Sequence, residues 1–292
     1  MRAEHEIFEA LVAWARSDDN VRAAILTGSR ADPDRTTDFL SDYDVEAYVT
    51  DVELFRESDE WLDAFGRIMA RWPHRPRGTV RDDGITRLAL FRDGVRIDFQ
   101  ILPVGALPAT IGDVGFRVLV DKDGLAERLS PLPALARAVA RPTEDEYEML
   151  VHEFWWNAHY VPKTLWRDEL PFAASMMSEA VRGYLRTALE WFVVVEHDGP
   201  VDTGVRGRWL KRYLDEETWS AYEATFSGAD LDAQWDAFSH AVALFRRLAQ
   251  AVGARLGYRY PEEVDREMTD YFERIRAHPR MDEAPRAPGE AA

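Results

Sequence analysis

The chain has 292 residues, which at ~100–200 residues per domain is enough for two domains with separate cores and excludes a small scaffold stapled by disulfides or metals. A hydrophobic content of 46%, with 10 Trp, 14 Phe and 10 Tyr, excludes an intrinsically disordered chain. The net charge of −17 argues against a nucleic-acid-binding protein but is compatible with a pocket for one nucleotide, and the absence of cysteine excludes thiol catalysis and cysteine-ligated zinc.

The first half of the chain alternates short apolar runs with turn residues, a pattern typical of mixed strands and helices. The spacing of its apolar residues predicts helices at 4–16 and 54–71 and strands at 21–26, 45–49, 86–91 and 95–102. The last two strands flank Asp93-Gly94, which predicts a β-hairpin.

The second half of the chain differs in texture. Prolines gather at 131–142, and after them long stretches have helical period, at 144–160, 172–196, 216–226 and 231–256. Thr143 and Glu146 have the spacing of a capping box at the first of these helices. We therefore expect an α+β protein with a mixed-sheet domain over 1–135, a helical domain over 136–278 and a flexible tail over 279–292.

The first eleven residues include several charged side chains and so cannot form the apolar core of a signal peptide. Elsewhere no stretch approaches the ~18 uncharged apolar residues of a membrane span. These features predict a cytoplasmic protein with no membrane contact.

Two carboxylates stand at the start of the predicted strand 45–49. Residues i and i+2 of a strand point to one face, so Asp42 and Asp44 would lie ~6.5–7 Å apart at their Cα atoms and both reach one cation. Asp-x-Asp is also common as a merely solvated start of a strand. Asp98 is harder to explain in that way, because it interrupts the apolar strand 95–102, where an isolated ionised carboxylate is costly.

If the strand of Asp98 lies beside that of Asp44, three carboxylates converge, and their repulsion calls for a divalent cation. Oxygen ligands favour Mg²⁺, which usually binds carboxylates together with substrate phosphates. Gly28-Ser29, a simple turn on its own, would then supply a phosphate cradle after the strand 21–26. This combination indicates phosphoryl or nucleotidyl transfer.

The same residues resemble a known family. Gly28-Ser29, Asp42-x-Asp44 and a later strand Asp at 98 are similar to the signature of the nucleotidyltransferase superfamily, which includes DNA polymerase β. A closer resemblance, over about residues 1–275, is to the aminoglycoside 6-adenylyltransferases, also called streptomycin adenylyltransferases. It is carried by the superfamily residues and by the segments 27–31, 96–98, 119–124, 153–156 and 160–170.

The resemblance implies a polymerase β-like nucleotidyltransferase domain followed by a helical substrate-binding domain, with the active site in the cleft between them. It also implies transfer of AMP from ATP to a hydroxyl of streptomycin, with release of pyrophosphate and inactivation of the antibiotic. In that reaction Asp42 and Asp44 would ligate Mg²⁺, and Asp98 would complete the metal site, act as the base, or both. Gly28 and Ser29 would hold the triphosphate, with Arg30 and Lys163 as further phosphate contacts.

A cationic aminoglycoside suits aromatic faces combined with negative charge, through cation–π contacts and charge-assisted hydrogen bonds. The predicted substrate-binding residues lie in the resembling helical segment: Trp155, Trp156, Trp166, Asp168 and Glu169. Aromatic residues at helical spacing also serve as core, and acidic residues also begin helices. Two other functions remain open: nucleotidyl transfer to a different small-molecule or protein acceptor, and an antitoxin-like regulatory role.

Overall fold

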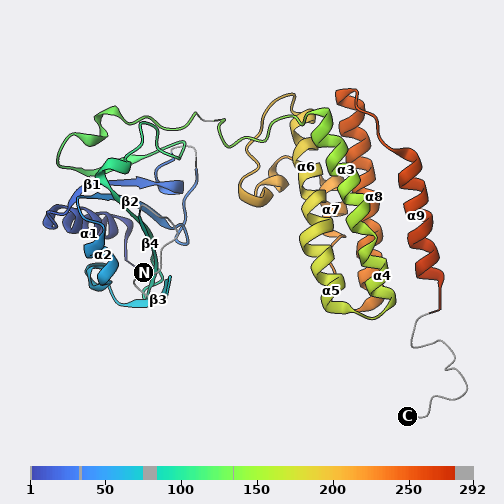
Figure 1. The fold of residues 1–292 in the computed structure, drawn as a ribbon, viewed down its shortest axis with the longest axis horizontal. Coiled ribbons are helices and arrows are strands. Elements are labelled where there is room, and N and C mark those ends of the chain that lie inside the picture. The colour runs from blue at the N-terminus through green and yellow to red at the C-terminus, as the bar shows by residue number, and fades with distance from the viewer. Residues whose placement is uncertain (1, 33–34, 75–83, 134, 280–292) are drawn as a thin grey trace, which may run out of the picture. The chain divides into compact units, whose positions relative to one another are not determined.

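The computed structural model describes residues 2–32, 35–74, 84–133 and 135–279. The chain divides into two compact units, Met1–Ala136 and Arg137–Ala292. The first is built on a mixed sheet and the second is helical, as Figure 1 shows for each unit by itself, so the predicted fold class is confirmed. None of the described helices is long and apolar enough to cross a bilayer.

The first unit has a six-stranded sheet in the order β3-β4-β5-β2-β1-β6. The strands are β1 Val21–Thr27, β2 Tyr43–Val49, β3 Ile68–Trp72, β4 Ile85–Phe91, β5 Arg96–Pro103 and β6 Arg117–Asp121. All neighbouring pairs are antiparallel except β2 and β5, which are parallel. The predicted hairpin at Asp93-Gly94 joins β4 to β5 and is confirmed.

Helices cover one face of this sheet. α1 (Glu4–Ser17) buries the apolar stripe of the predicted first helix, Ile7, Leu11, Trp14 and Ala15, in the main core of the unit. The opposite face is covered by the segments 104–116 and 125–129, on either side of β6, whose apolar side chains pack on Ile25 and Tyr48. Both faces of the central strands are therefore buried, which accounts for their nearly continuous apolar sequences.

The prediction of one helix over 54–71 is wrong. The structure has a short α2 (Glu53–Glu57), a 3-10 helix (Glu60–Phe65) and then strand β3. Gly66 separates them with a φ of 118°, a value that side-chain-bearing residues rarely adopt. The segment after Gly66 pairs with β4, and this long-range pairing overrides the local helical period.

The second unit contains seven α-helices among the described residues. They are α3 Glu144–Ala158, α4 Tyr160–Trp166, α5 Leu170–Ser175, α6 Arg182–Glu196, α7 Glu216–Glu223, α8 Leu231–Leu256 and α9 Glu262–Ala277, with a π-helical segment, Met176–Val181, between α5 and α6. The capping box is confirmed: Thr143 Oγ1 accepts from Glu146 N, and Glu146 accepts from Thr143 N.

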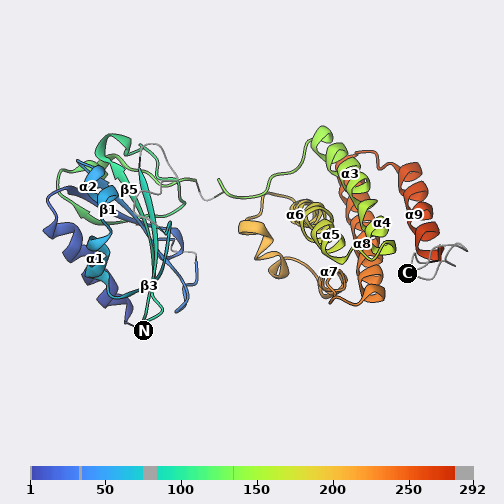
Figure 2. The ribbon, with the colours of Figure 1, turned by 60° about the horizontal axis from the view of Figure 1, so that its bottom comes forward.

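The last helix, α9, was not predicted. It packs against α3 and α4, and both figures draw it at the border of the helical group (Figures 1 and 2). Arg246 of α8 makes two 2.6 Å bonds to Asp265, which fix α9 to α8. The tail expected at 279–292 lies, beyond Pro279, outside the described residues.

Candidate active site

Asp42, Asp44 and Asp98 lie together at the N-terminal ends of β2 and β5. In the parallel register Asp44 is the direct partner of Asp98, and Tyr43 is the partner of Ile97. Asp42 immediately precedes β2 and so lies beside Arg96, the first residue of β5. Parallel neighbours are ~4.8 Å apart, so this pairing brings side chains 54 positions apart in sequence to one place.

Arg96 bridges two of these carboxylates. Its Nε and Nη2 donate to the two oxygens of Asp98 at 2.9 and 2.6 Å, and its Nη1 lies 3.2 Å from Oδ2 of Asp42. Arg96 reaches Asp98 because residues i and i+2 of a strand share a face. The Arg96 side chain is 42% exposed, so this ion pair is open to water on one side.

The electrostatics of the cluster are uneven. Burial, followed by the negative charges of Asp98, Asp42 and Asp113, raises the pKa of Asp44 from 3.8 to about 6, although Arg96 opposes the shift. Burial also raises the pKa of Asp42, against the lowering effect of Arg96. A carboxylate held above its ordinary pKa favours any added cation, because the cation relieves both the desolvation and the repulsion.

The Gly28 turn abuts the carboxylates. Gly28 follows β1 with a φ of +70°, and a Cβ placed on it would lie 1.9 Å from Oδ2 of Asp44. Only glycine fits this position, for reasons of both backbone and space. The Gly28 N–H donates to Oδ2 of Asp113 at 2.8 Å, so a fourth carboxylate, 6% exposed, holds the turn in place.

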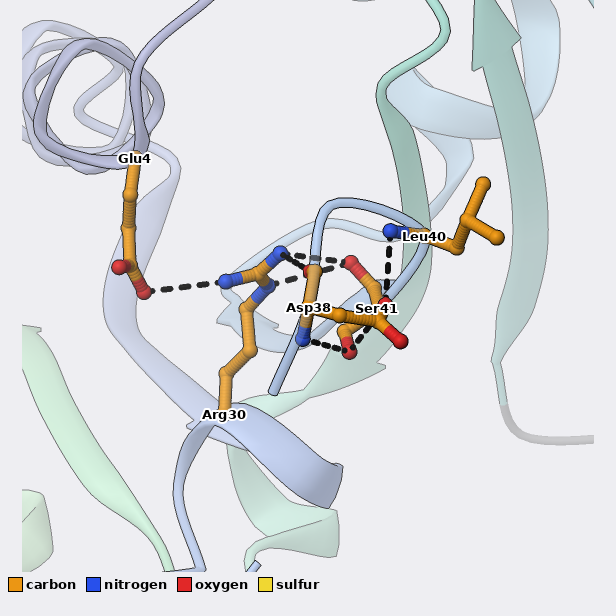
Figure 3. Close-up of polar contacts among 5 residues, drawn as sticks. All are labelled: Glu4, Arg30, Asp38, Leu40 and Ser41. Carbon is orange, nitrogen blue, oxygen red and sulfur yellow. Dashed lines mark hydrogen bonds and ion pairs between the residues drawn. The ribbon is translucent and has the colours of Figure 1, made fainter. Parts of the chain in front are cut away.

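The Arg30 side chain is held by the loop that precedes β2 and by α1. Figure 3 shows its guanidinium donating to the carbonyl oxygens of Asp38 and Ser41 and to the carboxylate of Glu4. The same group lies 4.0 Å from the centre of the Tyr43 ring. Arg30 thus fixes the loop that leads into Asp42. In this structure it serves the carboxylate strand rather than presenting a free guanidinium to a phosphate.

The predicted substrate-binding residues belong to the second unit, where they separate by burial. Trp155 is 1% exposed and stacks on Phe272 in the core, so its ring offers no surface to a ligand. Trp166 is half-buried, and its Nε1 donates to the Pro279 carbonyl at 3.0 Å. Trp155 was expected to offer an aromatic face to a cationic ligand, but it belongs to the buried face of α3.

Trp156, in contrast, is 65% exposed. It begins a row of aromatic rings that continues through His159, Tyr160 and Phe172, with centroid separations of 5.2, 4.0 and 6.3 Å. Lys163 lies beside the row, with Nζ 5.6 Å from the centre of the Tyr160 ring. We call these four rings the aromatic row.

Asp168 and Glu169 form the exposed turn between α4 and α5. Asp168 has a φ of 56°, and the Glu169 carbonyl accepts from the backbone of Phe172, a member of the aromatic row. Their side chains are open to solvent. Both residues therefore have a structural role at the start of α5 and also place negative charge near the row.

Sequence reasoning did not assign a function to Arg96 or Asp113. The i, i+2 spacing of Arg96 and Asp98 is a usable signal, because it puts a cation on the face of the carboxylates. Asp113 lies in an irregular loop, and its bond to Gly28 spans 85 positions, which no local pattern indicates. Glu153, whose Oε2 accepts from Asn157 and Tyr184, is a third polar group that was not singled out.

The carboxylates have the chemistry of a magnesium site but are not arranged as one. All three proposed ligands, Asp42, Asp44 and Asp98, offer carboxylate oxygens, which are the ligands that Mg²⁺ prefers, so the residues fit the ion. Over the described ranges, however, no three His, Cys, Asp or Glu side chains form a group that is ready to hold a metal ion. The guanidinium of Arg96 instead engages both oxygens of Asp98 and one oxygen of Asp42.

Comparisons with known proteins find similar sequences over most of the chain. The sequence profile of a family described as streptomycin adenylyltransferase matches residues 1–275. The chain is 31% identical to an aminoglycoside 6-adenylyltransferase of Bacillus subtilis (strain 168), covering 94% of this chain and 98% of that protein. It is 30% identical to an aminoglycoside 6-adenylyltransferase of Campylobacter jejuni, covering 89% and 92%.

Among solved structures, the chain is similar to the crystal structure of an aminoglycoside 6-adenyltransferase from Bacillus subtilis. The sequences are 27% identical, the TM-score is 0.47, and the match covers 95% of this chain and all of the other.

Proposed function

The chain belongs to the streptomycin adenylyltransferase family, and on that basis we propose that it transfers AMP from ATP to a hydroxyl of streptomycin. The products would be adenylylated streptomycin and pyrophosphate. We assign nucleotide binding to a nucleotidyltransferase domain over 1–135 and acceptor binding to a helical domain over 136–278.

The observation that carries this proposal is the pairing of Asp44 with Asp98 beside the Gly28 turn. The β2–β5 register brings two carboxylates together at a turn where only glycine fits, and Asp42 stands at the same strand ends. Arg96 offsets part of this charge, but burial and repulsion still raise the pKa of Asp44, so a bound divalent cation would stabilise the arrangement. Nucleotidyl transfer needs such a cation and its phosphate ligand in one place.

We infer that Asp42, Asp44 and Asp98 would hold Mg²⁺. When bound, the ion would neutralise charge on the triphosphate and orient it for displacement. Gly28 and Ser29 are the proposed triphosphate contacts, and Lys163 is a further proposed contact as a compact cation. Arg30, which is bonded to the 38–41 loop, is better assigned to holding Asp42 in position than to the phosphates.

In the transfer step, the acceptor hydroxyl oxygen would form a bond to the α-phosphorus while the bond to the bridging oxygen of pyrophosphate breaks. The hydroxyl proton must leave at the same time, and Asp98 is the candidate to accept it. Both oxygens of Asp98 accept hydrogen bonds from Arg96 in the present structure. Each of these oxygens keeps a second lone pair that can accept the proton, and release of a bond to Arg96 would free a further acceptor position.

For the acceptor, we propose the aromatic row together with the exposed acidic turn. The exposed ring of Trp156 and the partly exposed ring of Tyr160 would contact the apolar faces of a sugar and a guanidinium, and Asp168 and Glu169 would supply compensating charge. Trp166 also remains a proposed acceptor contact, although its ring and its Nε1 contact His278 and Pro279 rather than the row. Trp155 is left out, because it is buried in the core.

The test is pyrophosphate release by the full chain with ATP and Mg²⁺. Release with streptomycin, and none with water alone or with Asp44→Asn, is the expected result. Release only with another small-molecule or protein acceptor would replace streptomycin by that acceptor. No release with any acceptor, from a chain that folds, would overturn the enzymatic function and favour the antitoxin-like regulatory role.

A further inference from the structure

Arg96 occupies the oxygens that a divalent cation would need. Three negative side chains, Asp42, Asp44 and Asp98, meet one positive side chain, Arg96, which binds Asp98 through two hydrogen bonds and Asp42 through a 3.2 Å ion pair. Each carboxylate oxygen has a second lone pair, but a guanidinium held on these oxygens repels a divalent cation and crowds its ligand positions. The cation therefore binds more tightly when Arg96 moves away than when the two share the carboxylates.

The setting of Arg96 permits displacement. Its side chain is 42% exposed, so the guanidinium can turn into water without becoming a buried unpaired charge. Arg87, on the neighbouring strand β4, is 0% exposed and bonds Asp59, which is 4% exposed, and it has no such route. The two arginines belong to one sheet, but only Arg96 can leave its carboxylate and remain solvated.

We propose that Arg96 is a built-in competitor of the divalent cation, which keeps the carboxylate site closed to metal until the nucleotide arrives. The triphosphate would bring further oxygen ligands for the metal and negative charge for the released guanidinium. Metal loading is then coupled to nucleotide binding, and release of Arg96 frees Asp98 from the bonds that occupy both its oxygens. This inference rests on the proposed metal site at Asp42, Asp44 and Asp98.

The direct test measures Mn²⁺ binding to the full chain in the absence of nucleotide, at pH 8, by the electron paramagnetic resonance signal of free Mn²⁺. Mn²⁺ prefers the same oxygen ligands as Mg²⁺. Arg96→Gln should bind Mn²⁺ at least about tenfold more tightly than the unchanged chain, because one positive charge next to the ion has been removed. Equal or weaker binding by a folded Arg96→Gln would overturn the proposal.

A matched control is Arg22→Gln. Arg22 lies on β1 of the same sheet and, like Arg96, bonds both oxygens of one carboxylate, that of Asp123, at the surface. Its replacement should leave Mn²⁺ binding unchanged. A gain as large as that of Arg96→Gln would show a general charge effect and overturn the specific role of Arg96.

A second variant guards against misfolding. Arg96→Lys keeps the charge but loses the planar fork that bonds both oxygens of Asp98. It should bind Mn²⁺ more tightly than the unchanged chain and less tightly than Arg96→Gln. If Arg96→Gln does not fold, as judged by circular dichroism, the lysine variant decides: no gain in affinity overturns the proposal.

Adding a non-hydrolysable ATP analogue separates this inference from the function on which it rests. The unchanged chain should bind Mn²⁺ much more tightly with the analogue than without it, and Asp44→Asn should not. If the analogue produces no protein-bound Mn²⁺ in any variant, the proposed metal site itself fails. If it does, but removal of Arg96 changes nothing in its absence, only the role of Arg96 fails.

Discussion

Two arginines on adjacent strands of one sheet each pair with an aspartate, with similar bond lengths but different exposure to water. Arg87 on β4 donates to Asp59 at 2.6 Å, and Arg96 on β5 donates to Asp98 at 2.6 Å. The first pair is buried, with Arg87 0% exposed, whereas Arg96 is 42% exposed. Bond length therefore does not distinguish them, and access to water does.

The comparison teaches that one interaction can serve two purposes. Removing one partner of a buried ion pair strands the other charge in the core, so such a pair is a fixed part of the fold. In the second pair only the arginine is exposed, and Asp98 is 14% exposed, so Arg96 can leave for water while the carboxylate stays in place to accept another cation. We therefore expect changes at Asp98 and Arg96 to affect chemistry and metal binding, and changes at Arg87 to affect the fold.

The largest effect is expected from Asp98→Asn. Loss of a carboxylate that would ligate the metal or remove the proton should lower kcat by roughly 10³-fold or more, with circular dichroism unchanged. If Asp98 is the base, any residual activity should also lose its acid limb in the pH–rate profile. Near-full activity in this variant would contradict both proposed roles of Asp98. The control is Asp123→Asn, which removes the carboxylate that pairs with Arg22 at the surface and should leave kcat unchanged.

Arg87→Met tests the buried member of the comparison. It leaves Asp59 charged in the core, with Arg71 as its remaining partner at 3.0 Å, and should lower the free energy of unfolding by about 3–5 kcal/mol. Urea unfolding followed by circular dichroism measures this loss. Arg96→Gln should lower the same quantity by less than Arg87→Met does, because Arg96 is 42% exposed, although Asp98, which is 14% exposed, loses its partner. A similar loss for both variants would break the distinction drawn from exposure.

The fold, including the meeting of the three carboxylates, was largely readable from the sequence. Short apolar runs and the Asp-Gly turn located β1, β2, β4 and β5. Asp98 interrupts an apolar strand, which indicated that its carboxylate must have a cationic partner. β3 was missed because its pairing with β4 is non-local, whereas the helical period of 54–71 is local. Asp113 was missed because no periodicity describes a loop.

The site residues were harder to predict than the fold. Spacing on a helix tells which residues share a face but not which face is buried, so Trp155 and Trp156 looked equivalent in sequence, although the structure exposes 1% of one and 65% of the other. Similarly, the sequence places the positive charge of Arg30 two residues after Gly28. It does not show that the guanidinium donates its hydrogen bonds to the carbonyl oxygens of Asp38 and Ser41.

Asp44→Asn should produce an intermediate effect on stability. Folding raises the pKa of Asp44 from 3.8 to about 6, so the folded chain binds a proton more readily than the unfolded chain. Raising the pH from about 4 to 7 should therefore cost the metal-free protein on the order of 2 kcal/mol of stability. Asp44→Asn should remove this loss and be the more stable protein at pH 7, as measured by thermal unfolding in EDTA; equal slopes of stability against pH would contradict the shift.

The smallest expected effect extends the exposure argument to the second unit. Trp156 is 65% exposed and contacts the neighbouring ring of His159, so Trp156→Ala should leave thermal unfolding nearly unchanged. If the aromatic row binds the acceptor, the variant should raise the KM for streptomycin roughly fivefold, or about 1 kcal/mol, with kcat and the KM for ATP unaffected. Met149→Ala, at a 66% exposed position of the same helix but outside the row, is the matched control and should change neither. A raised KM for streptomycin alone would place the ring at the acceptor, because an exposed ring without a ligand has no other reason to alter the kinetics of one substrate. An unchanged KM would remove Trp156 from the binding surface.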